Sequence, residues 1–554
     1  MQTCVANVPQ RITDWQGVNW RKAHRVVKNL RQRIFRATRQ HDWKRVRNLQ
    51  RLLLRSYSNV LLAVRRVTQL NAGKATPGID KVLVKTGPAK AALVDKLTQT
   101  IPWKPVAARR VYIPKSNGKR RPLGIPTITD RCLQAMVKAA LEPCWEAQFE
   151  PTSYGFRPGR SAHDAIARIY VNAQAKNRKK WVVDADIAGC FDAINHRFLL
   201  KQIGNFPARG LIADWLSAGY LEEGVFHPTE AGTPQGGVIS PLLANIALHG
   251  MEAALGITRY AQGCIKKNVT RAIVRYADDF VVFCESKVEA DQTRIDLQRF
   301  LSLRGLQLSD EKTQIVHLSE GFDFLGFTIR HYPSHNTQTG WKLLITPAKQ
   351  SVARFREKLR HTFKRLHGCN ATAVITVLNP ILRGWANYYR GVVSSKVFEK
   401  LETYLFWKLQ RWATKTHPNK SYTWRKGRYW GVHPAYPGSL WSFFDPNTGM
   451  VLYRIGYTRI RRHVLIRGQA SPDDPECQGY FALRGKQSRQ LGDYPKSAQR
   501  IIRLQQGQCS LCGQSLFNGE PIHIHHKQPR HLGGTNHASN LMALHRVCHQ
   551  QVHR

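Results

Sequence analysis

The sequence predicts a multidomain α+β protein, and three observations support this fold class. A chain of 554 residues exceeds one ordinary hydrophobic core, so its length suggests about two to four domains. Short β-branched runs alternate with helical stretches over residues 105–345, whereas residues 350–430 carry helical patterns rich in Arg, Lys and Trp. The last 50 residues concentrate Cys and His, which indicates a small metal-bound unit at the end.

The net charge points to a polyphosphate partner. The chain carries 85 Lys and Arg against 36 Asp and Glu, a formal charge of +49, yet 42% of its residues are hydrophobic. Such a composition supports folded cores and excludes a disordered basic tail. Neutralising phosphates and releasing their counterions drives nucleic-acid binding. The alternative at this level is a basic protein of the ribosome or of a membrane surface, without chemistry of its own.

Targeting and redox signals are negative. The first residues, MQTCVANVPQR, lack the apolar segment of a secretory signal, and no stretch approaches the roughly 18 uncharged apolar residues of a membrane span. We therefore expect no membrane partner. Eleven cysteines are sparse and odd in number, which argues against a disulfide framework and favours a reducing, intracellular compartment.

Residues 1–85 are predicted to form a basic helical extension. Residues 20–70 contain 15 Lys and Arg with Asp42 as the only acid, and apolar residues recur at helical spacing. This basic face is either a solvated helix surface or a phosphate-binding one, and the charge favours the second. The segment ends at ATPGID (75–80), which is typical of a turn.

Residues 86–345 read as an α+β domain with hairpins. The predicted helices cover 130–148, 161–176 and 286–304, and the predicted strands are VYIP (111–114), WVVDADI (181–187), AIVRYADDFVVF (272–283) and FDFLGFTI (322–329). In the third run, Asp278 and Asp279 join two apolar halves, so we expect a hairpin that presents both carboxylates. Adjacent like charges are costly unless a cation neutralises them, which invites Mg²⁺. A solvated hairpin turn is the alternative.

A second strand adds further carboxylates. Asp184 and Asp186 interrupt the apolar run 181–187, and Phe191 lies five residues beyond Asp186. The two acids point to the same strand face, so spacing alone does not choose between them. Three carboxylates on neighbouring strands could hold two Mg²⁺ ions, activate a 3′-hydroxyl and stabilise a leaving pyrophosphate.

The segments after residue 345 differ in character. Residues 346–440 are predicted to be helical, and residues 351–470 carry 22 Lys and Arg against 4 Asp and Glu. Aromatic residues between 381 and 421 belong mainly to a helix core, while outward Arg and Lys would line a cleft for structured RNA. Over 441–500, the polar stretches SPDDPE (471–476) and LGDYPKS (491–497) are typical of a linker.

Residues 501–554 contain two groups of possible metal ligands. Cys509 and Cys512 form a Cys-x2-Cys pair, and His545 and Cys548 supply a second pair about 32 residues on. Four such ligands predict a closed, structural zinc site. The second group consists of His525, His526, Asn540, His549 and His553.

These motifs together resemble the group II intron-encoded proteins, a family of reverse transcriptases. The matching segments stand in the family's order over most of residues 85–345: RRVYIPKSNGKRRPLGIPTITDR (109–131), SYGFRPGRSAHDAI (153–166), VVDADIAGCFDAINH (182–196), AGTPQGGVISPLLANIAL (231–248), RYADDFVVF (275–283), LSDEKTQIVHL (308–318) and FDFLGF (322–327). The resemblance implies right-hand polymerase fingers and palm with an antiparallel sheet over 86–345 and an α-helical thumb, the maturase X domain, over 346–440. It also implies a DNA-binding region and linker over 441–500.

The resemblance assigns roles in a polymerase site with two Mg²⁺ ions. Asp186, Asp278 and Asp279 become catalytic metal ligands, and Ile187 lends its backbone carbonyl. Asp184 and Asp192 become supporting residues. The implied dNTP-binding residues are Lys115 and Arg121 on the triphosphate, Phe191 beneath the sugar where it excludes a 2′-hydroxyl, Gln235 in the Pro-Gln-Gly turn and Lys312 near the phosphates.

The tail resembles an HNH endonuclease, a small zinc-stabilised ββα-metal domain over 501–554. The resemblance makes His526 the general base, a role that suits imidazole near neutral pH. It makes Asn540 the residue that holds the catalytic loop, and it makes His525, His549 and His553 the ligands of one divalent metal ion. A zinc-stapled DNA-binding tip without cleavage is the alternative.

The implied protein is multifunctional: an RNA-directed DNA polymerase, a maturase that aids intron splicing, and an endonuclease that nicks target DNA to prime copying. Its implied partners are intron RNA, target DNA and dNTPs, with a homodimer left open. The implied location is a bacterial cytoplasm near the nucleoid, or an organelle. The alternatives are a relative that uses its polymerase for defence or host purposes and a non-catalytic RNA-binding splicing factor. The second would be expected to lose acids at 186, 278 or 279, and all three are present.

Overall fold

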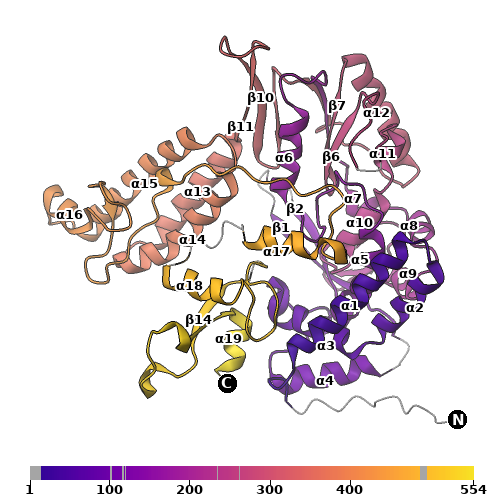
Figure 1. Cartoon of the computed structure of the whole chain (residues 1–554), viewed down its shortest axis with the longest axis horizontal. Helices are drawn as coiled ribbons and strands as arrows, with labels where there is room; N and C mark the ends of the chain where they lie inside the picture. The colour runs from indigo at the N-terminus through magenta and orange to yellow at the C-terminus, as the bar shows by residue number, and fades with distance from the viewer. Residues whose placement is uncertain are drawn as a thin grey trace.

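The computed structural model describes residues 14–99, 103–114, 118, 120–233, 235–260, 263–486, 494, 496–518 and 520–553. Lys115 lies outside the described residues. The described chain is a mixture of helices and small sheets, as the sequence predicts (Figure 1).

The N-terminal extension is helical, in agreement with its apolar spacing. It contains α1 (Trp20–Arg39), α2 (Trp43–Leu54) and α3 (Tyr57–Arg65), followed by a π-helical turn (Arg66–Leu70) and α4 (Gly87–Thr98). Asn19 and Asp42 cap the first two helices by accepting a backbone N–H with their side chains. The first three helices pack on α5 (Ile128–Glu146), and α5 contributes to two cores: its second half packs with α1 and α2, and its first half with the start of α1 and with α3.

The first sheet has the strand order β2-β1-β4-β5. Its members are β1 (Ala108–Pro114), β2 (Arg120–Ile125), β4 (Tyr220–Glu222) and β5 (Val225–His227). The β1–β2 pair is an antiparallel hairpin, whereas β1 and β4 pair in parallel. The antiparallel sheet predicted for residues 86–345 is therefore accompanied by a mixed one.

The second, central sheet is antiparallel throughout and has the strand order β6-β7-β3-β8. It comprises β3 (Trp181–Ala185), β6 (Ala272–Tyr276), β7 (Asp279–Cys284) and β8 (Gln314–His317). Alternate residues of β7 enter two different cores: Phe280 and Val282 enter one, and Val281 and Phe283 the other. Both faces of the sheet are therefore buried, which explains why these strands read as continuous apolar runs.

Helices cover the central sheet on both sides. In contact with its strands are α6 (Ala162–Asn172) on β6 and α12 (Lys287–Ser302) on β3 and β7. The remaining helices of this region are α7 (Cys190–Ala193), α8 (His196–Ile203), α9 (Arg209–Ser217), α10 (Ser240–Ala247) and α11 (Met251–Ala254).

A three-stranded antiparallel sheet leads into the helical region. It consists of β9 (Phe322–Phe324), β10 (Phe327–Pro333) and β11 (Trp341–Pro347). The helices that follow are α13 (Lys349–Arg365), α14 (Ala371–Tyr389), α15 (Ser395–Thr416) and α16 (Tyr422–Tyr429), and then the short strands β12 (Trp430–Gly431) and β13 (Ser442–Phe443) form a pair. Figure 1 shows these helices on the side away from α1–α4.

The segment 463–484, which we call the strap, returns from the helical region across the molecule. It contains a 3₁₀ turn (Pro475–Cys477) and most of α17 (Gln478–Lys486). The polar composition of 471–476 predicts a linker, but Ser471, Asp473 and Asp474 are only 1%, 6% and 5% exposed. The reason for the difference is that basic side chains from α1 pair with these acids, so polarity here marks a buried ionic contact.

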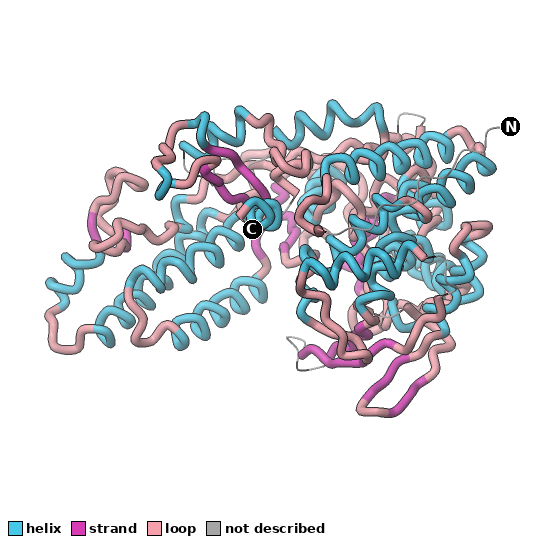
Figure 2. The backbone as a smooth tube through the Cα atoms, turned by 90° about the horizontal axis from the view of Figure 1, so that it is seen from below, coloured by secondary structure: helices cyan, strands magenta, loops and turns pink. Residues whose placement is uncertain are grey.

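The C-terminal unit is a ββα arrangement. After α18 (Lys496–Leu504) come the antiparallel strands β14 (Ile522–His526) and β15 (Leu541–His545) and the helix α19 (Arg546–Val552). Seen from below, the C-terminus lies between the helical region and the rest of the molecule (Figure 2). Among the described helices, none has both the length and the apolar character needed to cross a bilayer.

Candidate functional site

The hairpin of β6 and β7 presents two acids at its tip. Tyr276 pairs with Asp279, so the connecting turn consists of Ala277 and Asp278 alone. Ala277 adopts φ +60°, a left-handed conformation that is uncommon outside glycine. The turn rests on the loop before α6, where Tyr154 N–H donates to the carbonyl of Arg275 at 2.9 Å. This packing holds Asp278 and Asp279 at one end of the central sheet.

Asp186 lies at the same end, directly after β3. Ala185 pairs with Phe280, so Asp186 follows in register beside Asp279, and the two side chains contact each other. Lys312 donates a hydrogen bond from Nζ to Asp186 Oδ2. The structure therefore brings together all three predicted acids and Lys312.

The electrostatics of the acid cluster favour a cation. Burial, followed by the charges of Asp278 and Asp186, raises the pKa of Asp279 to about 7. Burial also raises the pKa of Asp278, with the charge of Asp186 acting in the same direction. Three crowded carboxylates supply the hard oxygen ligands that Mg²⁺ prefers, so the residues present fit the ion.

Asp184 and Asp186, which sequence spacing does not distinguish, have different hydrogen-bond partners in the structure. Asp184 Oδ2 accepts a hydrogen bond from Gln314 Nε2 on the neighbouring strand at 3.2 Å, and burial raises its pKa to about 6. Ile187 follows Asp186 and forms an isolated bridge with Leu308. The two hydrogen bonds of that bridge use the carbonyls of Asp186 and Gln307, so the Ile187 carbonyl takes part in neither.

Among the described residues predicted to bind nucleotide, Arg121, Gln235 and Phe191 have the following neighbours. Arg121 is exposed on β2, and its charge acts on Asp278. Gln235 joins its loop to the same strand, because its carbonyl accepts from Gly124 N–H at 2.6 Å. The Phe191 carbonyl accepts from Thr233 N–H at 2.5 Å, so α7 and the Pro-Gln-Gly loop are held against each other.

Sequence reasoning missed Phe156, which neighbours Phe191. The two rings meet edge to face with centroids 6.4 Å apart, and Phe156 is 49% exposed at φ +60°. An exposed aromatic residue held in a strained conformation is typical of a functional surface. The motif SYGFRPGR contained this signal, although its residue types alone name no chemistry.

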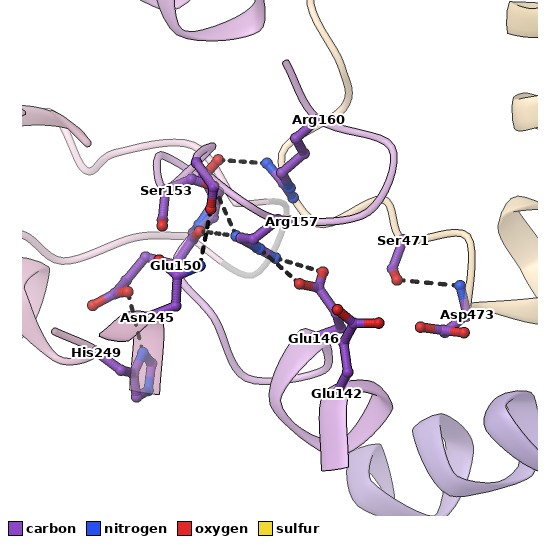
Figure 3. A network of polar contacts seen from close by, with 12 residues as sticks. Glu142, Glu146, Glu150, Ser153, Arg157, Arg160, Asn245, His249, Ser471 and Asp473 are labelled. Atoms are coloured by element: carbon purple, nitrogen blue, oxygen red, sulfur yellow. Dashed lines mark hydrogen bonds and ion pairs between the residues drawn. The ribbon is translucent and has the colours of Figure 1, made fainter. Parts of the chain in front are cut away.

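A buried ionic network supports the loop that carries Phe156 (Figure 3). Arg157 donates two hydrogen bonds to the Glu146 carboxylate, each 3.0 Å long, and two more to the carbonyls of Glu150 and Ser153. Asn245 bridges the network to the hairpin, because it donates to Gly155 O at 2.9 Å and accepts from Arg275 at 3.0 Å. These residues hold the loop that carries Gly155 against the β6–β7 turn.

The four predicted zinc ligands come together in the C-terminal unit. Ligand atoms of Cys509, Cys512, His545 and Cys548 all lie within 4.8 Å of one another, and all four residues are buried. His545 is oriented by Ser515, whose carbonyl lies 3.0 Å from Nε2. This closed Cys and His set is compatible with a zinc ion.

The second histidine group combines β14, which carries His525, with α19 and the residue after it, which carry His549 and His553. His525, His549 and His553 form a cluster within 4.8 Å, with His553 Nε2 3.0 Å from both His525 Nδ1 and His549 Nε2. Burial is the largest cause that lowers the pKa of His525, and it lowers that of His549 to about 4. Neutral imidazoles are the form that ligates metal ions.

His526 and Asn540 stand beside this cluster. His526 Nε2 lies 2.9 Å from Asn536 Oδ1, a partner that sequence reasoning did not name. Asn540 accepts from Gln528 N–H at 2.8 Å and donates to the carbonyls of Gln528 and Thr535 at 3.1 and 2.8 Å. Asn540 therefore fastens the loop that follows β14.

Four family models match consecutive parts of the chain. They are the N-terminal domain of reverse transcriptase over residues 15–97, reverse transcriptase (RNA-dependent DNA polymerase) over 113–329, the maturase-specific domain of group II introns over 352–430 and HNH endonuclease over 509–554. The described geometry of the acids and of the ββα unit falls inside the second and fourth matches.

Similar proteins come from several organisms. Group II intron-encoded protein LtrA of Lactococcus lactis subsp. cremoris is 30% identical, and the match covers 76% of this chain and 80% of that protein. Protein YkfC of Escherichia coli (strain K12) is 38% identical over 50% of this chain and 82% of that protein. Maturase-like protein 1 of Euglena gracilis is 25% identical over 69% and 78%, respectively. With the acids, the basic helices and the Cys/His unit in place, the chain belongs to the group II intron-encoded proteins, as a multifunctional member with RNA-directed DNA polymerase, maturase and HNH endonuclease regions.

Proposed function

We propose that the chain copies its intron RNA into DNA at the site formed by Asp186, Asp278 and Asp279. The observation that carries this proposal is the meeting of these three carboxylates and Lys312 at one end of the central sheet. Two Mg²⁺ ions held there, with the Ile187 carbonyl as a further ligand, would supply charge stabilisation for attack of a primer 3′-hydroxyl on an α-phosphate.

The surrounding residues orient the incoming dNTP. Arg121, on β2, grips the triphosphate together with Lys115, since guanidinium and ammonium groups neutralise phosphate oxygens. The Lys312 ammonium group exchanges its contact with Asp186 for one with the dNTP phosphates when nucleotide binds. Phe191 lies under the sugar and excludes a 2′-hydroxyl, and the Gln235 loop contacts the nucleotide. Asp184 and Asp192 support the site without binding metal.

Primer extension on an RNA template tests the polymerase proposal. Replacing Asp278 and Asp279 by Ala should abolish Mg²⁺-dependent dNTP incorporation, a loss of at least about a thousandfold, because the metal ligands are removed. Intron RNA binding should persist. Asp310→Asn is the matched control, since that carboxylate is 90% exposed only two residues before Lys312. Extension by the double variant at the wild-type rate would refute the assignment.

The C-terminal unit nicks target DNA in the same proposal. His526 takes a proton from the attacking water, and Asn536 orients its ring through the 2.9 Å contact. His525, His549 and His553 would hold one divalent ion, which would stabilise negative charge on the scissile phosphate, and Asn540 keeps the loop in place. Cys509, Cys512, His545 and Cys548 hold a structural Zn²⁺ that takes no part in the chemistry.

A nicking assay on supercoiled or oligonucleotide target DNA tests the nuclease assignment. His526→Ala should slow cleavage by about a hundredfold or more, because general-base catalysis is lost, and leave primer extension intact. His531→Ala is the control, since that exposed histidine lies in the same loop region. Loss of both activities in His526→Ala would contradict the division into a polymerase and a separate nuclease.

The helical region binds structured intron RNA and assists its splicing, and the RNA supplies the splicing chemistry. A groove of about 600 Å³ between α13 and α15 supports this assignment, because four basic side chains and one tyrosine stand among the apolar residues and one glutamate that line it: Lys349, Arg356, Arg360, Lys400 and Tyr404. We propose the divisions 1–85, 86–345, 346–440, 441–500 and 501–554 for the extension, polymerase, thumb, DNA-binding region and nuclease.

In the proposed order of events, the nuclease unit nicks one target strand, and the 3′ end at the nick then primes copying of the intron RNA. A non-catalytic splicing factor is not favoured, because both catalytic regions match their family models and the acids of the first are assembled.

A further inference from the structure

The C-terminal unit is packed against the N-terminal helices of the same chain. One continuous core contains Trp20, Val60 and Val64 from α1 and α3 together with Cys509, Cys548 and other residues of the zinc-ligand region. These two parts lie almost 500 residues apart in the sequence. The candidate zinc cluster is therefore also part of an interface.

Polar contacts at the rim of this interface come from the start of α1. Trp20 Nε1 donates to Gln551 Oε1 at 2.8 Å, and Arg21 Nη2 donates to the Ser510 carbonyl at 3.0 Å. Gly513 adopts φ +70°, a left-handed conformation that favours glycine, and the Arg21 side chain packs beside this turn. The Cys-x2-Cys turn is thus fitted to α1.

Arg65, at the end of α3, stands at the centre of the interface. Its side chain is 2% exposed, its Nη2 lies 3.0 Å from Cys548 Sγ, and its guanidinium lies 4.4 Å from the centre of the Trp20 ring. Within the described residues Arg65 forms no ion pair with a carboxylate, and its Nε and Nη1 have no hydrogen-bond partner. A buried guanidinium requires a counter-charge.

A metal-loaded cluster beside Cys548 supplies that charge. Three thiolates and a neutral imidazole around Zn²⁺ leave one net negative charge, shared by the sulfur atoms. The charge of Arg65 and that of a loaded cluster are complementary in sign and magnitude.

We propose that Arg65 is the counter-ion of the zinc–thiolate cluster, and that this pair docks the metal-loaded nuclease domain on the N-terminal helices of the polymerase. The inference rests on the proposed zinc site. Arg65 is a positioning residue: it recognises the loaded cluster from outside and ligates nothing. Zinc binding then controls the attachment of the nuclease domain to the polymerase as well as its fold.

The test uses the full-length chain and three variants. Arg65→Met removes the charge and keeps an apolar stem, Arg65→Lys restores the charge, and Arg66→Met is the matched control because Arg66 is the adjacent, exposed arginine. Zinc content is measured by atomic emission. Hydrogen–deuterium exchange reports docking through the first turns of α1 and through α19, and primer extension reports the integrity of the polymerase.

In Arg65→Met we expect zinc to remain bound and amide exchange at the start of α1 to rise on the order of tenfold, the factor that corresponds to about 1.4 kcal/mol. Arg65→Lys and Arg66→Met should exchange like the wild type. Chelating zinc from the wild-type chain should raise exchange at α1 to the level of Arg65→Met, an arm that needs no variant to fold.

The outcomes separate the two assignments. If the purified chain binds no zinc when the metal is supplied, the zinc site falls and the docking inference with it. If zinc is bound but Arg65→Met leaves exchange at α1 unchanged, or if chelation leaves α1 protected, only the docking inference is overturned.

Discussion

At the scale of single residues, the crowding of Asp186, Asp278 and Asp279 favours cation binding, because a cation would relieve the repulsion between their carboxylates. Burial and the charges of Asp278 and Asp186 raise the pKa of Asp279 to about 7. Its carboxylate is therefore partly protonated near neutral pH. Lys312 relieves only part of this charge through its bond to Asp186. Binding a divalent cation would lower the pKa of Asp278 and that of Asp279 together, which is the linkage expected of a metal site.

The proposed sugar-sensing role of Phe191 leads to a residue-scale prediction. Removing the ring in Phe191→Ala opens the space beneath the sugar, so ribonucleotide incorporation relative to dNTP should rise by about 10- to 100-fold. Phe156→Ala should give a smaller rise, because Phe156 would act on the sugar only through its edge-to-face contact with the Phe191 ring. Competing dNTP and rNTP in primer extension measures both ratios. Unchanged discrimination in Phe191→Ala would show that another group selects the sugar.

At the scale of elements, the β6–β7 hairpin depends on a glycine in another loop. A Cβ on Gly155 would lie 2.3 Å from Ala277 N and 2.8 Å from Tyr276 C, which are backbone atoms that cannot rotate away. The turn that carries Asp278 therefore sits where only glycine permits it. The Arg157–Glu146 pair holds the Gly155 loop in that place.

Gly155→Ala should displace the hairpin turn and cut primer extension by about a hundredfold, because displacements near 1 Å are sufficient to misalign a reacting centre. DNA nicking by the C-terminal unit should be unaffected. Gly210→Ala is the matched control, since nothing lies within 4 Å of the Cβ position there. Both variants are assayed for extension and nicking. Full primer extension by Gly155→Ala would mean that the added Cβ displaces the loop of Gly155 and leaves the β6–β7 turn in place.

The elements differ in how far the sequence predicts them. Strands, helices and the two Cys/His groups follow from local spacing, and the acids at 186, 278 and 279 could be placed together because paired strands and a short hairpin fix them. The Arg157–Glu146 pair, the Arg65–Cys548 contact and the burial of Asp473 and Asp474 could not be predicted. Each of them depends on which distant charge a polar residue meets, and composition reads such residues as exposed.

At the scale of the whole molecule, several of the few acids in a chain with a charge of +49 form internal ion pairs that hold distant segments together. Asp164 accepts from His463, Arg484 and the Ile466 N–H at 2.8–2.9 Å, which fixes the strap to the start of α6. Asp473 and Asp474 fix it to α1. The strap therefore connects the helical region, the central sheet and the N-terminal helices, and the nuclease unit follows it in the chain.

Arg31 is the main fastener of the strap, and its removal gives a prediction for the whole molecule. Its guanidinium donates to Asp473 at 2.8 and 2.6 Å, to Glu142 at 2.8 Å and to the Ala139 carbonyl at 3.1 Å. Arg31→Met leaves two largely buried carboxylates without this partner, at a cost of about 3 kcal/mol or more. The strap should then detach locally, because release lets Asp473 return to water.

Cleavage by a glutamyl endopeptidase after Glu476, an exposed residue of the strap, measures this detachment. Because proteolysis of an opened segment follows the population of the open form, cleavage of Arg31→Met should be about a hundredfold faster than that of the wild type. Arg33→Met is the control, since Arg33 is exposed on the same helix. Equal cleavage rates in the wild type and Arg31→Met would place the restraint on Asp164 at the other end of the strap. Faster cleavage with intact primer extension would support the role of Arg31 and show that polymerisation does not require an attached strap.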